Sequence, residues 1–390
     1  MTLSGETHQT HPAALRPRLA LASPILGNAA YIVEISGFSV ILASFAASSG
    51  TDPDRAVWIY SVYSAVVAIA ILAGGWIGDR FSARLVFVLG MTLFILGGVG
   101  FFFATTLGML LVARLLQGAG GGLFSPMVPV LLIAGSKSTD SNILSSWAII
   151  SGLVAAAAPL TFTMLSDSFG WRAASLAIPG IALSALVCTR WLPRTTREHE
   201  PRKLPRSTAF WMLAAHVFCV YGLTTYFLYV VPLQAVDIGI SHLDLGTALS
   251  ALWLAFAAGS GVVRKLNDDR HLLAYLVLGV ALDFIAIALF LLNPATITLF
   301  AGATILGAGM ALNNVPTTVL MLRLAPPQSK GMASSIDIVA ARAGGIATVS
   351  LLGTSPSLGL IGMIALSVLA VALLAPLFGT NSTAVISSTN

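Results

Sequence analysis

Long apolar runs dominate this sequence and constrain its fold more than any other feature. A helix that crosses a bilayer needs about 20 consecutive apolar residues. Only 9% of the 390 residues are charged, against about 25% in an ordinary soluble domain. The sequence therefore predicts an all-α integral membrane protein with twelve transmembrane helices. The runs lie near 22–48, 57–78, 85–104, 107–135, 143–166, 173–192, 208–236, 245–264, 272–292, 295–322, 332–354 and 359–379.

The distribution of basic residues predicts the orientation in the membrane. Lys and Arg concentrate in the cytoplasmic loops of membrane proteins. If both termini are cytoplasmic, the inner segments hold most of the Lys and Arg residues, and the outer loops hold Arg55 and Arg172. We expect a multi-pass protein of the bacterial plasma (inner) membrane with both termini in the cytoplasm. This topology accounts for the excess of 20 basic over 15 acidic residues, so we expect no nucleic-acid partner.

The chain divides into two halves at a basic, proline-containing segment, "TRWLPRTTREHEPRKLPRST", at 189–208. "LLQGAGGGL" at 115–123 aligns with "TILGAGMAL" at 304–312, which indicates an internal repeat. In proteins built from two such repeats, the binding site lies near the midplane, between the halves. We predict a cytoplasmic N-terminal tail, a six-helix bundle, a basic cytoplasmic linker, a second six-helix bundle and a cytoplasmic C-terminal tail. Their boundaries are 1–21, 22–192, 193–207, 208–379 and 380–390.

Two charges inside apolar runs are the main functional candidates. Glu34 lies in "YIVEISGF" and Arg114 in "ARLLQGAGG". A charge at the centre of a membrane helix costs about 2.5–3.5 kcal/mol on insertion scales, and such residues mark ion and substrate pathways. Burial raises the pKa of a carboxyl group and a nearby cation lowers it, so an acid between these influences can bind and release a proton. We hypothesise that Glu34 binds the coupling proton or a cationic substrate, with Arg114 as its neighbouring cation.

A structural alternative remains open for Glu34: a buried acid that is hydrogen-bonded and serves packing only. Helical spacing places Tyr31, Glu34 and Phe38 on one face, and Arg114 and Gln117 on one face of a second helix. The glycines after Gln117 allow close approach of a neighbouring helix. The predicted substrate-binding residues are Tyr31, Glu34, Phe38, Arg114, Gln117, Tyr221, Thr225, Asn314 and Arg342.

Three further charges lie within or near the later runs: Asp283, Asp337 and Arg342. For Asp283, helix packing and proton coupling are both open interpretations. Asp337 and Arg342 are five positions apart, about 140° around a helix, so we expect that neither is the main partner of the other. Arg342 is a candidate anchor for an anionic group.

The loop "GGWIGDRFSAR" contains Gly75, Asp79, Arg80 and Arg84 in the pattern G-x-x-x-D-R-x-x-x-R. This pattern resembles the signature loop of the major facilitator superfamily. "ARLLQGAGG" is similar to the R-x-x-Q-G-x-G pattern that is common in the proton-linked exporters of that superfamily. The resemblance implies that the loop lies against the start of the eleventh helix and helps to latch the outward-open state. Asp337 is the candidate ionic partner of this latch.

The resemblance implies a transporter whose two halves rock around one central site. The favoured expectation is proton-driven export of a small amphipathic drug or metabolite. The alternative is an importer or exchanger of small organic anions, with Arg114 and Arg342 as carboxylate anchors. HExxH and P-loop motifs are absent from the sequence and the two cysteines lie in apolar runs, so we expect neither an enzyme nor a metal site. The expected energy source is the proton gradient, without a cofactor. The expected partners are the lipid bilayer, protons and a small-molecule substrate. A monomer is sufficient for this architecture.

Overall fold

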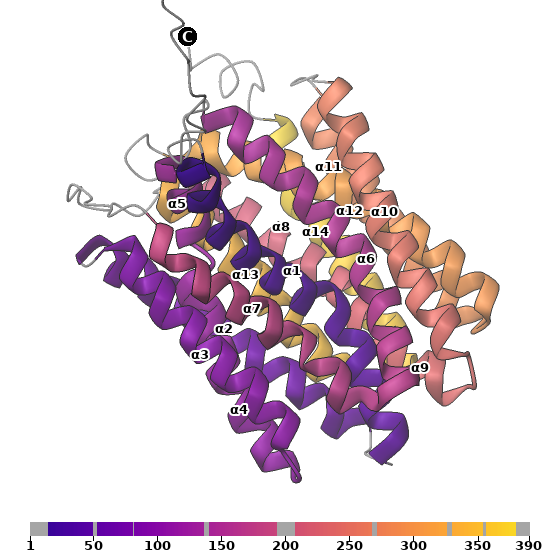
Figure 1. The fold of residues 1–390 in the computed structure, drawn as a ribbon. Helices are drawn as coiled ribbons and strands as arrows, with labels where there is room; N and C mark the ends of the chain where they lie inside the picture. Colours follow the sequence, from indigo (N-terminus) through magenta and orange to yellow (C-terminus); the bar gives the residue numbers. More distant parts are fainter. Residues whose placement is uncertain are drawn as a thin grey trace, which may run out of the picture.

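The computed structural model describes residues 15–49, 53–80, 82–135, 140–192, 207–266, 271–325, 330–353 and 356–379. Every element in this part of the chain is helical (Figure 1). Eleven helices are long and apolar enough to cross a membrane, and a shorter apolar stretch, Ala177–Trp191, supplies a twelfth candidate. The expected all-α membrane fold is confirmed. The elements are α1 (Leu15–Ser49), α2 (Pro53–Arg80), α3 (Ala83–Phe103), α4 (Leu107–Phe124), α5 (Met127–Gly135), α6 (Asp140–Ser175), α7 (Ala177–Cys188), η2 (Thr189–Trp191), α8 (Thr208–Thr225), η3 (Tyr226–Val230), α9 (Val231–Asp237), α10 (His242–Leu266), α11 (Leu272–Leu292), α12 (Thr296–Leu324), α13 (Lys330–Leu352) and α14 (Pro356–Gly379).

Proline and glycine explain where the helices depart from the apolar runs. The run at 107–135 is broken at Pro126 into α4 and α5, because proline lacks an N–H and its ring clashes with the preceding turn. Gly170 has a φ of 80° inside α6, a conformation that glycine adopts readily, and the chain turns there. The sixth helix was expected to be continuous over 173–192. It is instead interrupted before α7, whose third residue, Pro179, cannot donate to the preceding turn.

The seventh span also departs from a regular helix. It consists of α8, the π turn η3 and α9. Pro232 follows this turn in the first turn of α9 and cannot donate to the carbonyl of Leu228, so the wider turn accommodates the missing bond. The π turn contains Tyr229, whose hydroxyl donates to the Ile35 carbonyl of α1 at 3.2 Å. The irregular turn therefore lies directly at a contact between the first and second halves of the chain.

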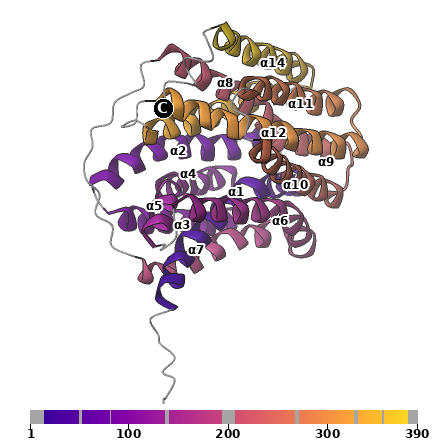
Figure 2. The same ribbon diagram turned by 90° about the horizontal axis from the view of Figure 1, so that it is seen from above.

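The helices gather in two groups (Figure 2). In the first group, α1 packs on α6 and α7, and α4 packs on α2 and α3. In the second group, α12 packs on α10 and α11, and α8 packs on α13 and α14. Between the groups, α2 packs on α13 and α6 on α10, while α1 contacts η3, α9 and α10. The exact boundaries of the two bundles and of the tails and linker remain predictions.

Hydrogen bonds between the groups lie at one end and in the middle of the bundle, as far as the described residues show. Near the end where α1 stops and α2 begins, Ser61 bonds Ser350 at 2.9 Å and His242 Nδ1 lies 3.3 Å from Asp167 Oδ1. Closer to the middle, the Leu160 amide donates to Ser250 Oγ at 3.2 Å. The two groups are therefore joined at this end.

Glycines allow α3 and α4 to cross almost backbone to backbone. A Cβ atom built at Gly97 would lie 2.6 Å from the Ala113 carbonyl oxygen and 2.7 Å from Gln117 Cα. Real Cβ atoms do not approach other atoms so closely. The crossing therefore requires glycine, which has no side chain, at position 97. Because Gln117 is one of the predicted site residues, this crossing also fixes part of the site.

We expect Gly97→Ala to lower the free energy of unfolding by about 1–3 kcal/mol, the usual range for an overpacked core. Gly100→Ala is the matched control in the same helix, because its Cβ would meet Ala113 Cβ at an ordinary 3.6 Å. Thermal melting of the detergent-purified protein measures the difference. Equal melting temperatures for the two variants would contradict the close-crossing argument.

Candidate functional site

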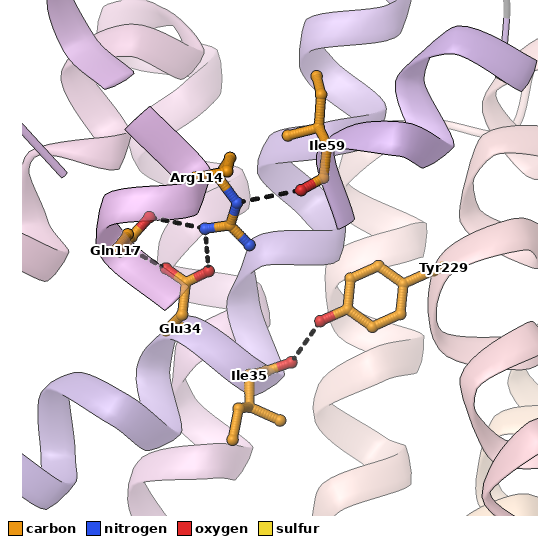
Figure 3. Close-up of polar contacts among 6 residues, drawn as sticks. All are labelled: Glu34, Ile35, Ile59, Arg114, Gln117 and Tyr229. Carbon is orange, nitrogen blue, oxygen red and sulfur yellow. Dashed lines mark hydrogen bonds and ion pairs between the residues drawn. The ribbon is translucent and has the colours of Figure 1, made fainter. Parts of the chain in front are cut away.

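Glu34 of α1 and Arg114 of α4 form a buried ion pair in the first group of helices (Figure 3). Arg114 Nη1 donates to Glu34 Oε1 and to Gln117 Oε1, the second bond at 2.7 Å. Gln117 Nε2 donates to Glu34 Oε2 at 3.0 Å. Glu34 is 1% exposed and Arg114 0% exposed. The three side chains, called the Glu34 cluster below, therefore form a closed polar network away from solvent.

Two aromatic rings and a carbonyl hold the guanidinium of Arg114. Its Cζ lies 3.8 Å from the centroid of the Phe38 ring and 4.0 Å from that of Tyr63, and a desolvated cation–π contact is worth about 2 kcal/mol. Nε donates to the Ile59 carbonyl at 3.3 Å. Within the described part of the chain, Nη2 has no hydrogen-bond partner, and neither does the buried Tyr63 hydroxyl. Helices α1, α2 and α4 thus fix the position of this cation, yet leave one donor unused.

The Glu34 cluster has two charge states. With Glu34 ionised, its charge and that of Arg114 cancel. With Glu34 protonated, the guanidinium is an uncompensated cation in a low-dielectric interior, where such a charge interacts strongly with its surroundings. A single proton can therefore change the net charge of this region by one unit.

Arg342 of α13 lies across the interface between the groups. Its Nη2 donates to the hydroxyl of Tyr31 at 3.0 Å, and its Cζ lies 5.9 Å from the Tyr31 ring centroid. Among the described residues, Glu34–Arg114 is an ion pair, and Asp167 and His242 form a contact that is ionic only when His242 is protonated. In that part of the chain Arg342 therefore has no acidic partner. No ion pair between Asp337 and Arg342 is found among the described residues.

Four tyrosines from both groups of helices lie near Arg342. They are Tyr31, whose hydroxyl accepts its hydrogen bond, and Tyr60, Tyr63 and Tyr229. The rings of Tyr60 and Tyr229 lie 4.0 Å apart between centroids. Tyr63 interacts electrostatically with both Arg114 and Arg342. We call Arg342 and these four residues the Arg342 cluster, and Tyr63 connects it to the Glu34 cluster.

The other predicted substrate-binding residues lie in two places. Thr225 lies beside the Arg342 cluster, because a Cβ at Gly345 would meet Thr225 Oγ1 at 2.6 Å and Tyr60 Oη at 2.8 Å. Asn314 Nδ2 donates to the Tyr221 hydroxyl at 2.8 Å, which is a satisfied bond between α12 and α8. Among the described residues, no contact joins Asn314 or Tyr221 to the Glu34 cluster.

Asp283 forms a separate polar pair between α11 and α12. Asn313 Nδ2 donates to Asp283 Oδ2 at 2.8 Å. A Cβ at Gly279 would meet the Asn313 side chain at 2.7 Å, so glycine makes room for the amide. Of the two interpretations left open for Asp283, this geometry favours helix packing.

The latch predicted from the signature loop is only partly visible. Helix α2 continues to Arg80, but the side chains of Asp79 and Arg80, and the surroundings of Gly75, lie outside the described residues. Arg84 donates to the Leu192 carbonyl at 3.3 Å, and Asp337 accepts from Thr318 at 3.3 Å. The latch therefore remains a prediction.

Sequence reasoning missed the contribution of α2. The Ile59 carbonyl and the side chains of Tyr60 and Tyr63 all line the two clusters. Tyr60 and Tyr63 are three positions apart, so they share a helix face. Two hydroxyl-bearing rings on one face of an otherwise apolar run were the available signal, but without a charge they resembled ordinary core residues.

Comparisons with known proteins agree with this architecture. Residues 25–349 match the sequence profile of the Major Facilitator Superfamily. The drug efflux pump JefA of Mycobacterium tuberculosis is 28% identical over 188 residues, which cover 48% of this chain and 37% of JefA. The arabinose-proton symporter of Escherichia coli is 31% identical over 157 residues, which cover 38% of this chain and 33% of the symporter.

Among solved structures, the crystal structure of the peptide transporter POT in complex with sulfate is similar over the whole fold. Its TM-score is 0.77 at 15% sequence identity, and the match covers 95% of each chain. This likeness shows the fold alone. The sequence matches span well under half the length of JefA and of the arabinose-proton symporter.

Proposed function

Because this chain belongs to the Major Facilitator Superfamily, and is a multi-pass secondary transporter rather than an enzyme, we propose that protons drive its transport cycle through the Glu34 cluster. The observation that carries the proposal is the buried ion pair between Glu34 and Arg114. Isolated pairs of this kind are expensive inside a membrane and commonly mark proton or ion pathways. Here the pair lies next to the interface between the two groups of helices.

In the proposed cycle, the two groups rock so that the interface opens to one side of the membrane and then to the other. Glu34 releases its proton when Arg114 pairs with it and binds a proton when the pair is separated. Tyr63 stacks on Arg114 and also interacts with Arg342. It therefore connects the proton site to the residues proposed to contact substrate.

The first candidate direction is export of a small amphipathic molecule in exchange for protons. The helix 4 motif around Arg114 and the similarity to the drug efflux pump JefA support it. With both termini in the cytoplasm, as the basic loops favour, the contacts Ser61–Ser350 and Asp167–His242 join the two groups on the outer side. A carrier working by alternating access passes through such a conformation in either direction of transport, and an exporter of the bacterial inner membrane would receive its substrate in it.

The second candidate is proton-linked import or exchange of small organic anions, with Arg114 and Arg342 as carboxylate anchors. The specific observation in its favour is Arg342, which has no acidic partner among the described residues. The similarity to the arabinose-proton symporter supports proton-linked uptake as a mode, although that protein's substrate is a sugar.

The test uses sealed proteoliposomes that contain the purified protein and a lumenal pH dye. An imposed proton gradient is combined with lipophilic cations, neutral drugs and carboxylates, and wild type is compared with Glu34→Gln. We expect substrate-evoked proton movement in wild type and its loss in Glu34→Gln, because the amide cannot exchange a proton. The matched control is Asp237→Asn, which removes an exposed acid at the end of α9 and outside both clusters. Substrate movement without proton flux, unchanged in Glu34→Gln, would refute the proposal.

A further inference from the structure

We propose that the Arg342 cluster is the binding site for an oxyanion group of the transported molecule, and that the substrate is an organic acid. This deepens the proposed transport function and rests on it. The inference follows from three features: the charge at the interface, the supply of hydrogen-bond donors, and the aromatic surroundings of the guanidinium.

The charge at the interface is the first feature. Glu34 and Arg114 cancel each other, whereas Arg342 has no acidic partner among the described residues. With Glu34 ionised, the two clusters together therefore carry one positive charge. Arg342 is half-buried, and pairing of its guanidinium with a ligand anion removes the cost of a partly desolvated charge without a counterion. A cationic substrate would instead meet an excess of like charge.

The second feature is an excess of hydrogen-bond donors over acceptors. Arg342 has five N–H donors, and one of them is bonded to the Tyr31 hydroxyl. Tyr31 accepts that bond, which leaves its own O–H as a further donor. Among the described residues, the buried Tyr63 hydroxyl has no hydrogen-bond partner. Oxyanions supply several acceptor lone pairs in one group, and the planar guanidinium matches a carboxylate in a bidentate geometry.

The third feature is the aromatic wall. Tyr60 and Tyr229 stack against each other, and Tyr31 packs edge-on against Phe124 with 5.9 Å between ring centroids. Such rings bind an apolar or aromatic body next to the charged group, because ligand sites combine apolar surfaces with a few placed polar groups. The chemistry therefore points to a carboxylate or sulfonate on an apolar body rather than to an inorganic anion.

The anion site also determines whether anion binding strengthens or weakens the binding of a proton to Glu34. Protonation of Glu34 leaves Arg114 as a second cation near Arg342, so a proton and an anion favour each other's binding, and this linkage is reciprocal. Cooperative binding favours movement of both in the same direction, which is the second candidate mode.

The titratable and charged groups around this region are Glu34 and Tyr31 on α1, Tyr60 and Tyr63 on α2, Arg114 on α4, Tyr221 on α8, Tyr229 on η3, and Asp337 and Arg342 on α13.

The experiment measures binding to the purified full chain without any gradient. The probes are benzoate, benzamide and benzamidine, which share a ring but carry negative, neutral and positive groups, together with the same three groups on naphthalene and sulfate as an inorganic oxyanion. Competition against one labelled naphthalene carboxylate gives the affinities. We expect each carboxylate to bind about tenfold or more tightly than its amide, since hydrogen bonds to charged groups are worth about 1.5–3 kcal/mol.

Variants then assign the effect to Arg342. Arg342→Gln should abolish the preference for carboxylate over amide, and Arg342→Lys should restore part of it, because lysine keeps the charge without the planar fork. Tyr31→Phe should weaken the carboxylate and leave the amide series less affected. The matched control is Arg190→Gln, which removes an arginine stacked on Trp191 at 3.9 Å, at the end of the helix and outside both clusters.

The outcomes separate this inference from the proposed function. A carboxylate that binds no more tightly than its amide, or a preference that survives in Arg342→Gln, overturns the anion site. Sulfate binding as tightly as the aromatic carboxylates overturns the organic-acid assignment. Carboxylate binding through Arg342 with no proton-coupled transport would leave the anion site standing and remove the proposed function. Proton-coupled transport of cations, unchanged in Arg342→Gln, would do the reverse.

Discussion

Replacing Arg114 by methionine is expected to lower the free energy of unfolding by about 3–5 kcal/mol, the range for removing one partner of a buried ion pair. Glu34 would then lie in the bundle without the guanidinium that neutralises it. Gln117 alone would remain as its hydrogen-bond donor. Melting temperature and denaturant titration in detergent, compared with wild type at equal pH, provide the measurement.

A double-mutant cycle gives the control. Glu34→Gln combined with Arg114→Met removes both charges, so the double variant should recover much of the stability lost in Arg114→Met alone. Such recovery shows coupling between two side chains in contact. Arg190→Met is the matched arginine control, because its guanidinium stacks on Trp191 and faces no carboxylate among the described residues. An additive cycle would show that the pair does not determine the stability of this region.

The second large effect concerns pH. We expect benzenesulfonate, whose own charge does not titrate between pH 5 and 8, to bind wild type more tightly as the pH falls. If one proton is taken up for each anion bound, the affinity rises by at most about tenfold per pH unit. Glutamine imitates the protonated acid, so Glu34→Gln should bind tightly and with a smaller pH dependence than wild type. Equilibrium competition binding at several pH values measures both.

The control for this effect is Asp237→Asn, which removes an exposed acid at the end of α9 and should retain the pH dependence of wild type. Weaker sulfonate binding at low pH would mean that the proton and the anion compete. That result would contradict the cooperative linkage and support exchange of substrate against protons. The direction of the pH dependence therefore distinguishes the two transport modes.

Much of the fold could be predicted because the bilayer limits what an apolar run can do. Backbone groups in hydrocarbon must bond internally, so runs of the right length become helices. The interruptions were harder to predict. Pro126 and Pro179 are visible in the sequence, but membrane helices tolerate proline when neighbouring groups satisfy the freed carbonyls, so the residue alone does not decide whether a helix breaks.

The candidate site, too, could be predicted from the sequence only in part. Glu34 and Arg114 were identifiable because an intramembrane charge is rare, and Gln117 because it shares a face with Arg114. Their mutual contact was expected only as a hypothesis, since no sequence pattern pairs α1 with α4. The distances across the interface were beyond reach, because Tyr31 and Arg342 are brought together by packing between residues far apart in the chain.

The unpaired guanidinium of Arg342 has a consequence for the electrical behaviour of the protein. When the empty site changes sides, its single positive charge moves through part of the membrane field, and crossing the full field is worth about 2.3 kcal/mol per 100 mV for one elementary charge. A bound organic anion cancels this charge, but the proton that binds with it on Glu34 leaves Arg114 uncompensated, so the loaded site carries the same single positive charge. Membrane voltage would therefore act equally on the loaded and the empty site as they move in opposite directions, and a complete cycle with one proton and one monovalent anion would carry no net current.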